Sequence, residues 1–171
     1  GVFSALAAAS AVQSEEANRR GALLLDMGAG TTDFILFQNN VVYESGVLAI
    51  GCEHLANDLA VGLDLNVAQC RKLLVEDAFG RRKRDGYHTL ELTGNITRRE
   101  IPLDTIEKVI DLRLRETFGL IRQRLQERNQ LTHLGGIFVT GGAAMLANTR
   151  NALFTVFETP VTIVGNELPG D

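Results

Sequence analysis

The sequence contains little cysteine, no long apolar run and no excess of basic residues. Its two cysteines, Cys52 and Cys70, are too few for a disulfide framework, so a reducing cytosol is the default compartment. No run of about eighteen apolar residues exists that could span a bilayer. The formal net charge of -4 at pH 7 gives no support for a nucleic-acid-binding surface, which is normally basic. We therefore expect a cytoplasmic protein that does not bind nucleic acid.

The residues that are present indicate a globular chain. Its 171 residues are 45% hydrophobic and 22% charged, which is enough for one sizeable core. That length suits one domain, which can consist of two lobes. The chain starts at Gly1 without an initiator Met, inside a predicted helix, and stops at Asp171 soon after a predicted strand. We expect it to be part of a larger protein.

The most informative stretch is residues 23–37, in which two apolar runs of strand length flank a short polar turn. This pattern predicts a β-hairpin around a tight turn. Gly28 and Gly30 have no Cβ, so the turn can adopt positive φ and let a phosphate approach the main-chain N–H groups. Thr31 and Thr32 add hydroxyl donors. The turn is therefore a candidate phosphate-binding loop.

Asp26 stands at the end of the first strand of this hairpin. Mg²⁺ keeps much of its water and is usually held by one or two carboxylates together with the phosphates of a substrate. We therefore predict that Asp26 faces a hydrated Mg²⁺. The alternative is a plain hairpin whose glycines only make the turn. Turn chemistry explains Gly and Asp readily, but it does not explain a Thr-Thr pair that faces an Asp.

The motif Asp-x-Gly-x-Gly-Thr-Thr-Asp after an apolar strand resembles the second phosphate loop of the actin-like ATPase superfamily. Residues 135–146 form a short apolar strand that runs into Gly-Gly and then a predicted helix, which is similar to the adenosine loop of that superfamily. The resemblance implies ATP and Mg²⁺ as cofactors, with both loops at one cleft. It assigns the phosphates to Gly28, Ala29, Gly30, Thr31 and Thr32, and the adenosine side to Gly141, Gly142 and Ala143.

Two features depart from the superfamily pattern. The helix before the phosphate loop often carries an acidic residue, followed by Pro, that positions the attacking water, and Ser4 and Ala5 stand at those positions here. Ser is a poor base, so we expect at most weak ATPase activity in the intact protein and none in this chain. The Glu-x-x-Lys pair that contacts ribose and adenine is matched by Gln69-x-x-Lys72, which lacks the acid. An ordinary solvated helix face explains Gln69 and Lys72 about as well.

Two further segments narrow the resemblance to the bacterial cell-division family FtsA. Residues 50–63 have the pattern Ile-Gly-x-x-His-x-x-Asn-Asp-Leu-Ala-x-Gly-Leu, and residues 97–116 are similar to the FtsA segment that receives the acidic C-terminal tail of FtsZ. The resemblance implies that Arg113 and Glu116 contact this tail, whereas an i,i+3 ion pair on a solvated helix is the alternative. His54 has no second His or Cys at ligand spacing, so we expect it to start or pack a helix.

The order of the predicted elements agrees with this resemblance. The patterns predict an Ala-rich helix at 1–16, three strands up to residue 50, helices at 51–63 and 67–79, a hairpin at 87–96, a long helix at 104–128, a strand at 137–140, a helix at 143–157 and a strand at 161–164. The basic run from Arg81 to Arg84 is expected in a solvated loop.

We expect an α/β fold, the ribonuclease-H-like lobe of actin-type ATPases. It would have a mixed sheet with an antiparallel β-meander, flanking helices and a small inserted α+β subdomain. Residues 1–53 and 135–171 would form the larger sheet subdomain, and residues 54–134 the smaller one.

The resemblance implies the C-terminal lobe of an FtsA-like protein, an ATP-binding adaptor that forms filaments and links the FtsZ ring to the membrane. Such a protein is cytoplasmic and peripheral on the inner face of the membrane, attached through a segment absent from this chain. A sugar or acid kinase and a chaperone-type ATPase are alternatives within the superfamily, but neither explains residues 97–116. Because the other half of the cleft is missing, we expect weak or undetectable ATP binding by this chain alone.

Overall fold

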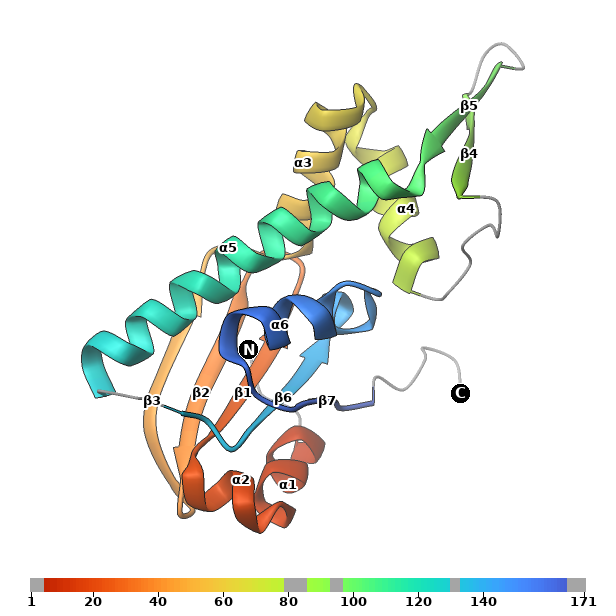
Figure 1. Ribbon diagram of the computed structural model, residues 1–171. Coiled ribbons are helices and arrows are strands. Elements are labelled where there is room, and N and C mark those ends of the chain that lie inside the picture. Colours follow the sequence, from red (N-terminus) through yellow and green to blue (C-terminus); the bar gives the residue numbers. More distant parts are fainter. Residues whose placement is uncertain (1–4, 79–85, 93–96, 130–132, 166–171) are drawn as a thin grey trace.

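The computed structural model describes residues 5–78, 86–92, 97–129 and 133–165. A five-stranded sheet lies at its centre (Figure 1). The strands β1 (Ala22–Met27), β2 (Thr32–Gln38) and β3 (Val41–Leu48) form an antiparallel meander, and β6 (Gly136–Gly141) and β7 (Val161–Ile163) continue the sheet in parallel with β1. The order is β3-β2-β1-β6-β7. The inner strands β1 and β6 are almost continuously apolar because both of their faces are covered.

One face of the sheet is covered by α5 (Leu103–Asn129) and α6 (Thr149–Phe157), and α3 (Cys52–Leu63) packs against α5 beyond the upper end of the sheet (Figure 1). Leu23 and Leu25 of β1 point to this side and are fully buried in the larger core cluster. Because successive side chains of a strand point to opposite faces, Leu24, which stands between them, points to the other face of the sheet.

That other face is covered by α1 (Ala5–Gln13) and α2 (Glu15–Arg20), against which Leu24 packs. The single helix predicted at the start of the chain was therefore wrong. The side-chain oxygen of Ser14 accepts a hydrogen bond from the N–H of Ala17 at 3.4 Å, which makes Ser14 the N-cap of a second helix. Ser4, expected at the position of the water-binding acid, lies outside the described residues.

The helix α5 crosses the whole molecule (Figure 1). It has 27 residues, so it is about 40 Å long. Its bounds confirm the helix predicted at 104–128 to within one residue at each end. The predicted apolar stripe is buried along its full length, at Ile106, Ile110, Leu114, Phe118, Ile121 and Leu125.

Between α3 and α5 the chain forms α4 (Val67–Ala78) and a two-stranded hairpin of β4 (Tyr87–Leu92) and β5 (Thr97–Pro102). The hairpin predicted at 87–96 begins where expected, but its second strand ends only at Pro102. The basic run from Arg81 to Arg84 lies outside the described residues. The larger core cluster continues from the sheet into α4, and the proposed division into two subdomains stays a prediction.

The helix predicted from Ala143 to Phe157 is interrupted. A short 3-10 helix, η1 (Gly142–Met145), comes first, and α6 begins only at Thr149. The hydroxyl of Thr149, which is fully buried, donates a hydrogen bond to the Ala143 carbonyl oxygen at 2.6 Å. This bond joins η1 to the first turn of α6 and stabilises the break between them.

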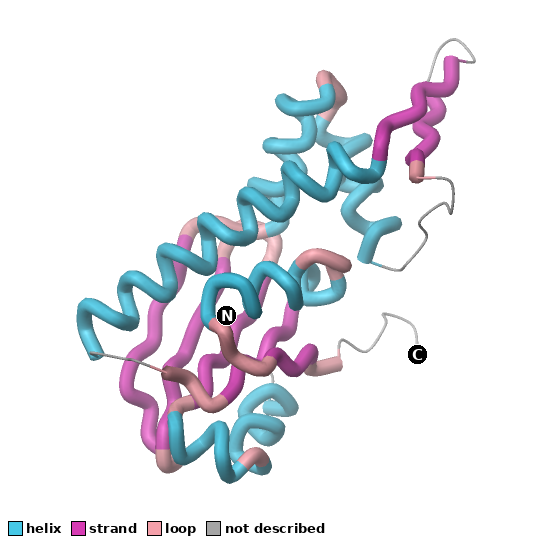
Figure 2. The backbone as a smooth tube through the Cα atoms, in the orientation of Figure 1, coloured by secondary structure: helices cyan, strands magenta, loops and turns pink. Residues whose placement is uncertain are grey.

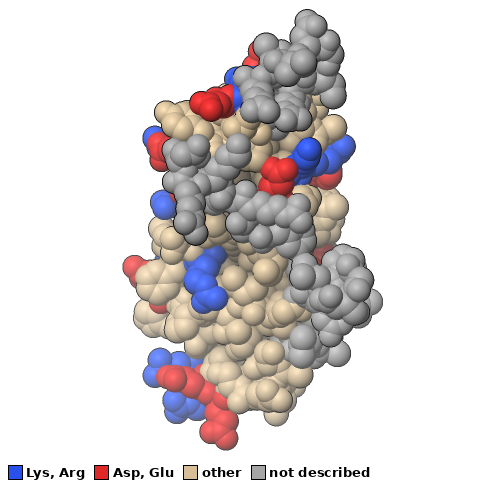
Figure 3. All heavy atoms as spheres, turned by 90° about the vertical axis from the view of Figure 1, so that its right-hand side faces the viewer, with Lys and Arg blue, Asp and Glu red and all other residues tan. Residues whose placement is uncertain are grey.

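Charged side chains are unevenly spread over the surface. Figure 3 shows the side of the molecule that faces right in Figure 1; they gather at its upper and lower ends, and most of the described surface between these ends is uncharged. The lower group lies over α2, whose sequence is Glu-Glu-Ala-Asn-Arg-Arg. Within the described part of the chain, none of the helices combines the length and apolarity needed to cross a membrane.

Candidate functional site

The two glycine-bearing loops meet at one edge of the sheet. In the parallel pair of β1 and β6, Asp26 lies opposite Thr140 and Met27 lies opposite Gly141. Ligands of open α/β sheets bind at the carboxyl ends of parallel strands, and both loops leave the sheet at these ends (Figure 2). The structure thus brings Asp26 and Gly141 together, as expected from the sequence.

The orientation of the first loop is set by the N-terminus of α3. The carbonyl oxygens of Gly28 and Ala29 accept hydrogen bonds from the N–H groups of Cys52 and Glu53, at 3.0 and 2.8 Å. In a planar trans peptide the N–H points away from the C=O, and none of the described peptide bonds is cis. The N–H groups of Ala29 and Gly30, two exposed residues, therefore point away from α3 and toward solvent.

The two threonines of the loop differ in exposure. Thr31 is exposed, and its carbonyl oxygen accepts the N–H of Gly28 at 2.9 Å. Thr32 is fully buried, and its hydroxyl donates to the Ile50 carbonyl oxygen at 2.7 Å. The Thr32 hydroxyl therefore joins β2 to the segment before α3. Of the two threonine hydroxyls, only that of exposed Thr31 is accessible to a ligand.

The backbone of Gly51 packs closely against the backbone of the loop at Gly28 and Ala29. This role of Gly51 was not predicted from the sequence. A Cβ at Gly51 would stand 2.6 Å from the carbonyl oxygens of both Gly28 and Ala29. Gly141 makes a similar approach, because it has φ of +95° and an added Cβ would lie 2.4 Å from the Met27 carbonyl oxygen. Both glycines allow two backbone segments to approach more closely than any side chain would permit.

Two carboxylates lie on the strands that the loop connects. Asp26 and Asp33 are directly opposite each other in the antiparallel pair of β1 and β2. Burial, and then the nearby charge of Asp33, raise the pKa of Asp26 above its ordinary value. Carboxylate oxygens are ligands that Mg²⁺ prefers, so the two carboxylates beside the candidate phosphate loop fit the predicted metal.

The predicted adenosine contacts on α4 lie beside η1, against which α4 packs. Lys72 is exposed there. The side chain of Gln69 accepts the N–H of Asn66 at 3.2 Å, and the Asn66 side chain accepts the N–H of Gln69 at 2.8 Å. This reciprocal pair caps the N-terminus of α4, so Gln69 already has a structural role.

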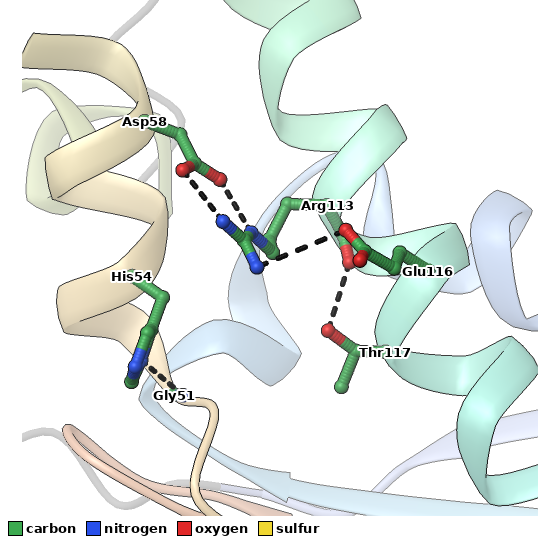
Figure 4. Close-up of polar contacts among 6 residues, drawn as sticks. All are labelled: Gly51, His54, Asp58, Arg113, Glu116 and Thr117. Atoms are coloured by element: carbon green, nitrogen blue, oxygen red, sulfur yellow. Dashed lines mark hydrogen bonds and ion pairs between the residues drawn. The ribbon is translucent and has the colours of Figure 1, made fainter. Parts of the chain in front are cut away.

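The predicted partner residues lie where α3 faces α5 (Figure 4). The guanidinium of Arg113 makes a two-point ion pair with Asp58, with Nη2 at 2.7 Å from Oδ1, and Glu116 lies 3.7 Å from it. The Asp58 carboxylate raises the pKa of Arg113 further above its ordinary value. Two exposed apolar side chains occur on the same helices, Val61 at 87% and Leu112 at 72% exposure.

His54 lies in the first turn of α3 and does not join this ion pair. Its Nδ1 accepts the N–H of Gly51 at 3.0 Å, which closes the first turn of the helix (Figure 4). The predicted helix-start role of His54 is confirmed.

Comparison with known proteins decides the family. The model of the family "Cell division protein FtsA" matches residues 23–169, which is most of the chain. The chain belongs to the FtsA family. It is 30% identical over 167 residues to FtsA of Borreliella burgdorferi, which covers 95% of this chain and 40% of the relative. It is 25% identical over 166 residues to FtsA of Pseudomonas aeruginosa, with the same coverage of both chains. The chain thus spans about 40% of the FtsA proteins that it matches.

Solved structures show the fold of this FtsA-family chain. MreB5 of Spiroplasma citri bound to ADP superposes with a TM-score of 0.69 at 19% identity, over 94% of this chain and 53% of MreB5. The PilM-PilN type IV pilus biogenesis complex matches with a TM-score of 0.62 at 20% identity, over 91% of this chain and 38% of that chain. The predicted fold class is confirmed as the actin-like ATPase fold.

Proposed function

We propose that this chain supplies one wall of the ATP cleft of an FtsA-type cell-division protein. The observation that carries the proposal is the direction of the loop peptides. Their carbonyl oxygens are bonded to α3, while the N–H groups of Ala29 and Gly30 face solvent. Successive free N–H groups next to glycines form an anion-binding surface, which suits the β- and γ-phosphates of ATP. Gly141, Gly142 and Ala143, on the neighbouring strand end, would lie along the adenosine.

Asp26 would hold a hydrated Mg²⁺ at the same edge. When bound, the metal neutralises phosphate charge. The protein's part is to place Asp26 at the sheet edge from which both loops leave. Burial and the charge of Asp33 raise the pKa of Asp26. A cation nearby would therefore stabilise the ionised form of this carboxylate.

A charge placed on the loop tests the ATP proposal. A Cβ at Gly30 would meet no atom within 4 Å, so Gly30→Glu and Gly30→Gln both have room for their side chains. In the full-length protein that contains this chain, Gly30→Glu should weaken Mg·ATP binding at least about tenfold relative to Gly30→Gln, because its carboxylate repels phosphate. Calorimetry that shows equal affinities for the two variants would contradict the proposal.

We also propose that the face between α3 and α5 receives the acidic tail of FtsZ at Arg113 and Glu116. The support is a half-buried cation on two helices that also carry exposed apolar side chains, Val61 on α3 and Leu112 on α5. An acidic side chain of the tail would have to share Arg113 with Asp58. Filament formation and a peripheral position on the inner membrane face belong to the same proposal. The family assignment favours this function over the metabolic-kinase and chaperone alternatives.

A tail peptide tests the partner site. Arg113→Gln removes the charge and keeps a long polar side chain, whereas Arg113→Glu would put a carboxylate next to Asp58 and Glu116. Arg113→Gln should weaken binding of an FtsZ tail peptide by about tenfold. The control is Arg115→Gln on the same helix, where Arg115 pairs with Asp111. Equal affinity for the two variants, with both folded by circular dichroism, would remove the partner site and leave the ATP proposal standing.

A further inference from the structure

The first turn of α3 contacts both loops of the candidate ATP site. The N–H groups of its first two residues donate to the carbonyl oxygens of Gly28 and Ala29, at 3.0 and 2.8 Å. The sulfur of Cys52 lies 4.0 Å from the carbonyl oxygen of Met27, at the start of the phosphate loop. The same sulfur is 3.5 Å from the point where a Cβ of Gly142 would stand, at the start of η1. The start of α3 is therefore in contact with the phosphate side and with the adenosine side.

Glu53, in this first turn, makes one contact with its main chain and another with its side chain. Its N–H donates to the Ala29 carbonyl oxygen, so the N–H of Gly30 on the same planar peptide points away from α3. Its carboxylate accepts hydrogen bonds of 2.9–3.1 Å from Nε and Nη2 of Arg71, a residue of α4. One residue thus connects the peptide that faces the phosphates to a second helix.

That second helix, α4, carries the predicted adenosine contacts. Arg71 is next to Lys72 in the chain and two positions after Gln69. The helix packs against both α3 and η1 (Figure 1). Because a helix moves largely as one rigid element, any shift of Arg71 relative to Glu53 would also move Lys72 relative to the phosphate loop. The Glu53–Arg71 contact therefore bears on the spacing of the two sides of the site.

The pair is built for orientation more than for stability. The Arg71 side chain is 55% exposed and that of Glu53 is 41% exposed, and exposed ion pairs contribute little to stability. Hydrogen bonding from Arg71 lowers the pKa of Glu53 below its ordinary value, so both groups are charged at neutral pH. A guanidinium that contacts both oxygens of a carboxylate also fixes the relative orientation of the two groups.

Taking the ATP site proposed above as given, we propose that Glu53 and Arg71 are positioning residues that hold α4 at the distance from the phosphate loop at which one ATP molecule reaches both. Neither side chain has to touch the nucleotide. A ligand that uses two separate parts of a site binds best when these parts are already correctly spaced, since no ordering is then required. Loss of the pair should therefore weaken binding of ATP more than binding of a ligand that consists of phosphates alone.

The ratio of two affinities tests the proposal in the full-length protein that contains this chain. The ligands are Mg·ATP and tripolyphosphate with Mg²⁺, each measured by competition with a fluorescent ATP analogue. Glu53→Ala and Arg71→Ala each remove one partner and insert a good helix former. Each should lower the ratio of ATP affinity to tripolyphosphate affinity at least about fivefold, and the double variant should lower it no further, because both substitutions break the same contact.

The control is Glu16→Ala, which breaks an exposed ion pair with Arg20 on α2. This pair lies on a helix that contacts neither loop, so the affinity ratio should equal that of the wild type. Tripolyphosphate binding by the Glu53→Ala and Arg71→Ala variants would show that their phosphate loop is still formed.

The measurement separates positioning from charge and from direct contact. If the pair acted only through its charges, Glu53→Ala would strengthen and Arg71→Ala would weaken the binding of both ligands, and the ratio would not change. If Arg71 contacted the adenosine itself, Arg71→Ala alone would lower the ratio. Either result would overturn the positioning role and leave the ATP site standing. A wild-type protein that binds neither ligand would overturn the ATP site and the positioning role together.

Discussion

Asp58 and Arg113 join α3 to α5 through two hydrogen bonds between one carboxylate and one guanidinium. Both side chains are 26% exposed, so the pair is better shielded from water than the other ion pairs along α5 that stay within the helix. Charge-assisted two-point pairs are stronger than single contacts. The pair therefore contributes to stability as well as to the proposed partner face.

Asp58→Asn should destabilise the fold by about 1–2 kcal/mol, because it leaves a shielded guanidinium without its carboxylate. The matched control is Asp111→Asn, which breaks an i,i+4 pair with Arg115 inside α5 and should cost less than about 0.5 kcal/mol. Urea denaturation of the two variants measures the difference. Equal losses would show that the cross-helix pair is no stronger than a surface pair.

Gly51→Ala should destabilise the fold by about 1–3 kcal/mol, because the new methyl group would press on two loop carbonyl oxygens at 2.6 Å. Gly62→Ala in the same helix is the control, since its Cβ would only reach ordinary contact with Val109 at 3.5 Å. That substitution should be neutral or stabilising by up to about 1 kcal/mol. Thermal melts of both variants would expose an error if Gly51→Ala proved as stable as Gly62→Ala.

Asp26→Asn should stabilise the chain at neutral pH. The pKa of Asp26 is raised in the folded state, so its favourable contribution is fully present only below the unfolded pKa. That contribution is lost as the pH rises through the raised pKa, and at pH 7 the ionised group opposes folding. The melting temperature of Asp26→Asn should therefore exceed that of the wild type at pH 7, and the gap should narrow toward pH 4. A less stable variant at pH 7 would refute this account.

Arg124→Ala should destabilise the fold more than Arg128→Ala. Arg124 lies under the Phe34 ring at 5.2 Å and beside the carboxylate of Glu44, and it is 32% exposed against 63% for Arg128. We expect a loss of about 2–4 kcal/mol for Arg124→Ala, which removes a cation–π contact and a shielded ion pair. The loss for Arg128→Ala should stay below about 1 kcal/mol. Chemical denaturation that ranks the two in reverse would contradict this assignment.

The sequence was most informative where local pattern and fold agree. The spacing of Gly28 and Gly30 after an apolar strand predicted the loop, and the stripe from Ile106 to Leu125 predicted α5 almost to its ends. Both features are periodic or local, so neighbouring residues carry them. The N-cap of α2 was readable as well, since Ser14 precedes Glu-Glu, but the apolar residues before it favoured one continuous helix.

Contacts between distant segments were not predictable from one sequence. Asp58 and Arg113 are 55 positions apart, and no periodicity links them. The support that Gly51 gives to the loop depends on the return of the chain after β3. The break before Thr149 depends on a buried hydroxyl that bonds to Ala143, in a stretch that contains no Pro and no further Gly. In the first two cases a contact between distant segments decides the arrangement, and in the third a buried hydrogen bond across six residues outweighs helix propensity.

Ion pairs connect α5 to two other elements of the fold. Arg113 holds one part of it to α3, and Arg124 and Arg128 hold the other end to Glu44 on the edge strand. These ion pairs attach one long helix both to α3 and to the outer strand β3. Since the first peptides of α3 are bonded to the loop carbonyl oxygens, an unbroken series of polar contacts and helices connects the candidate phosphate loop to the outermost strand of the sheet.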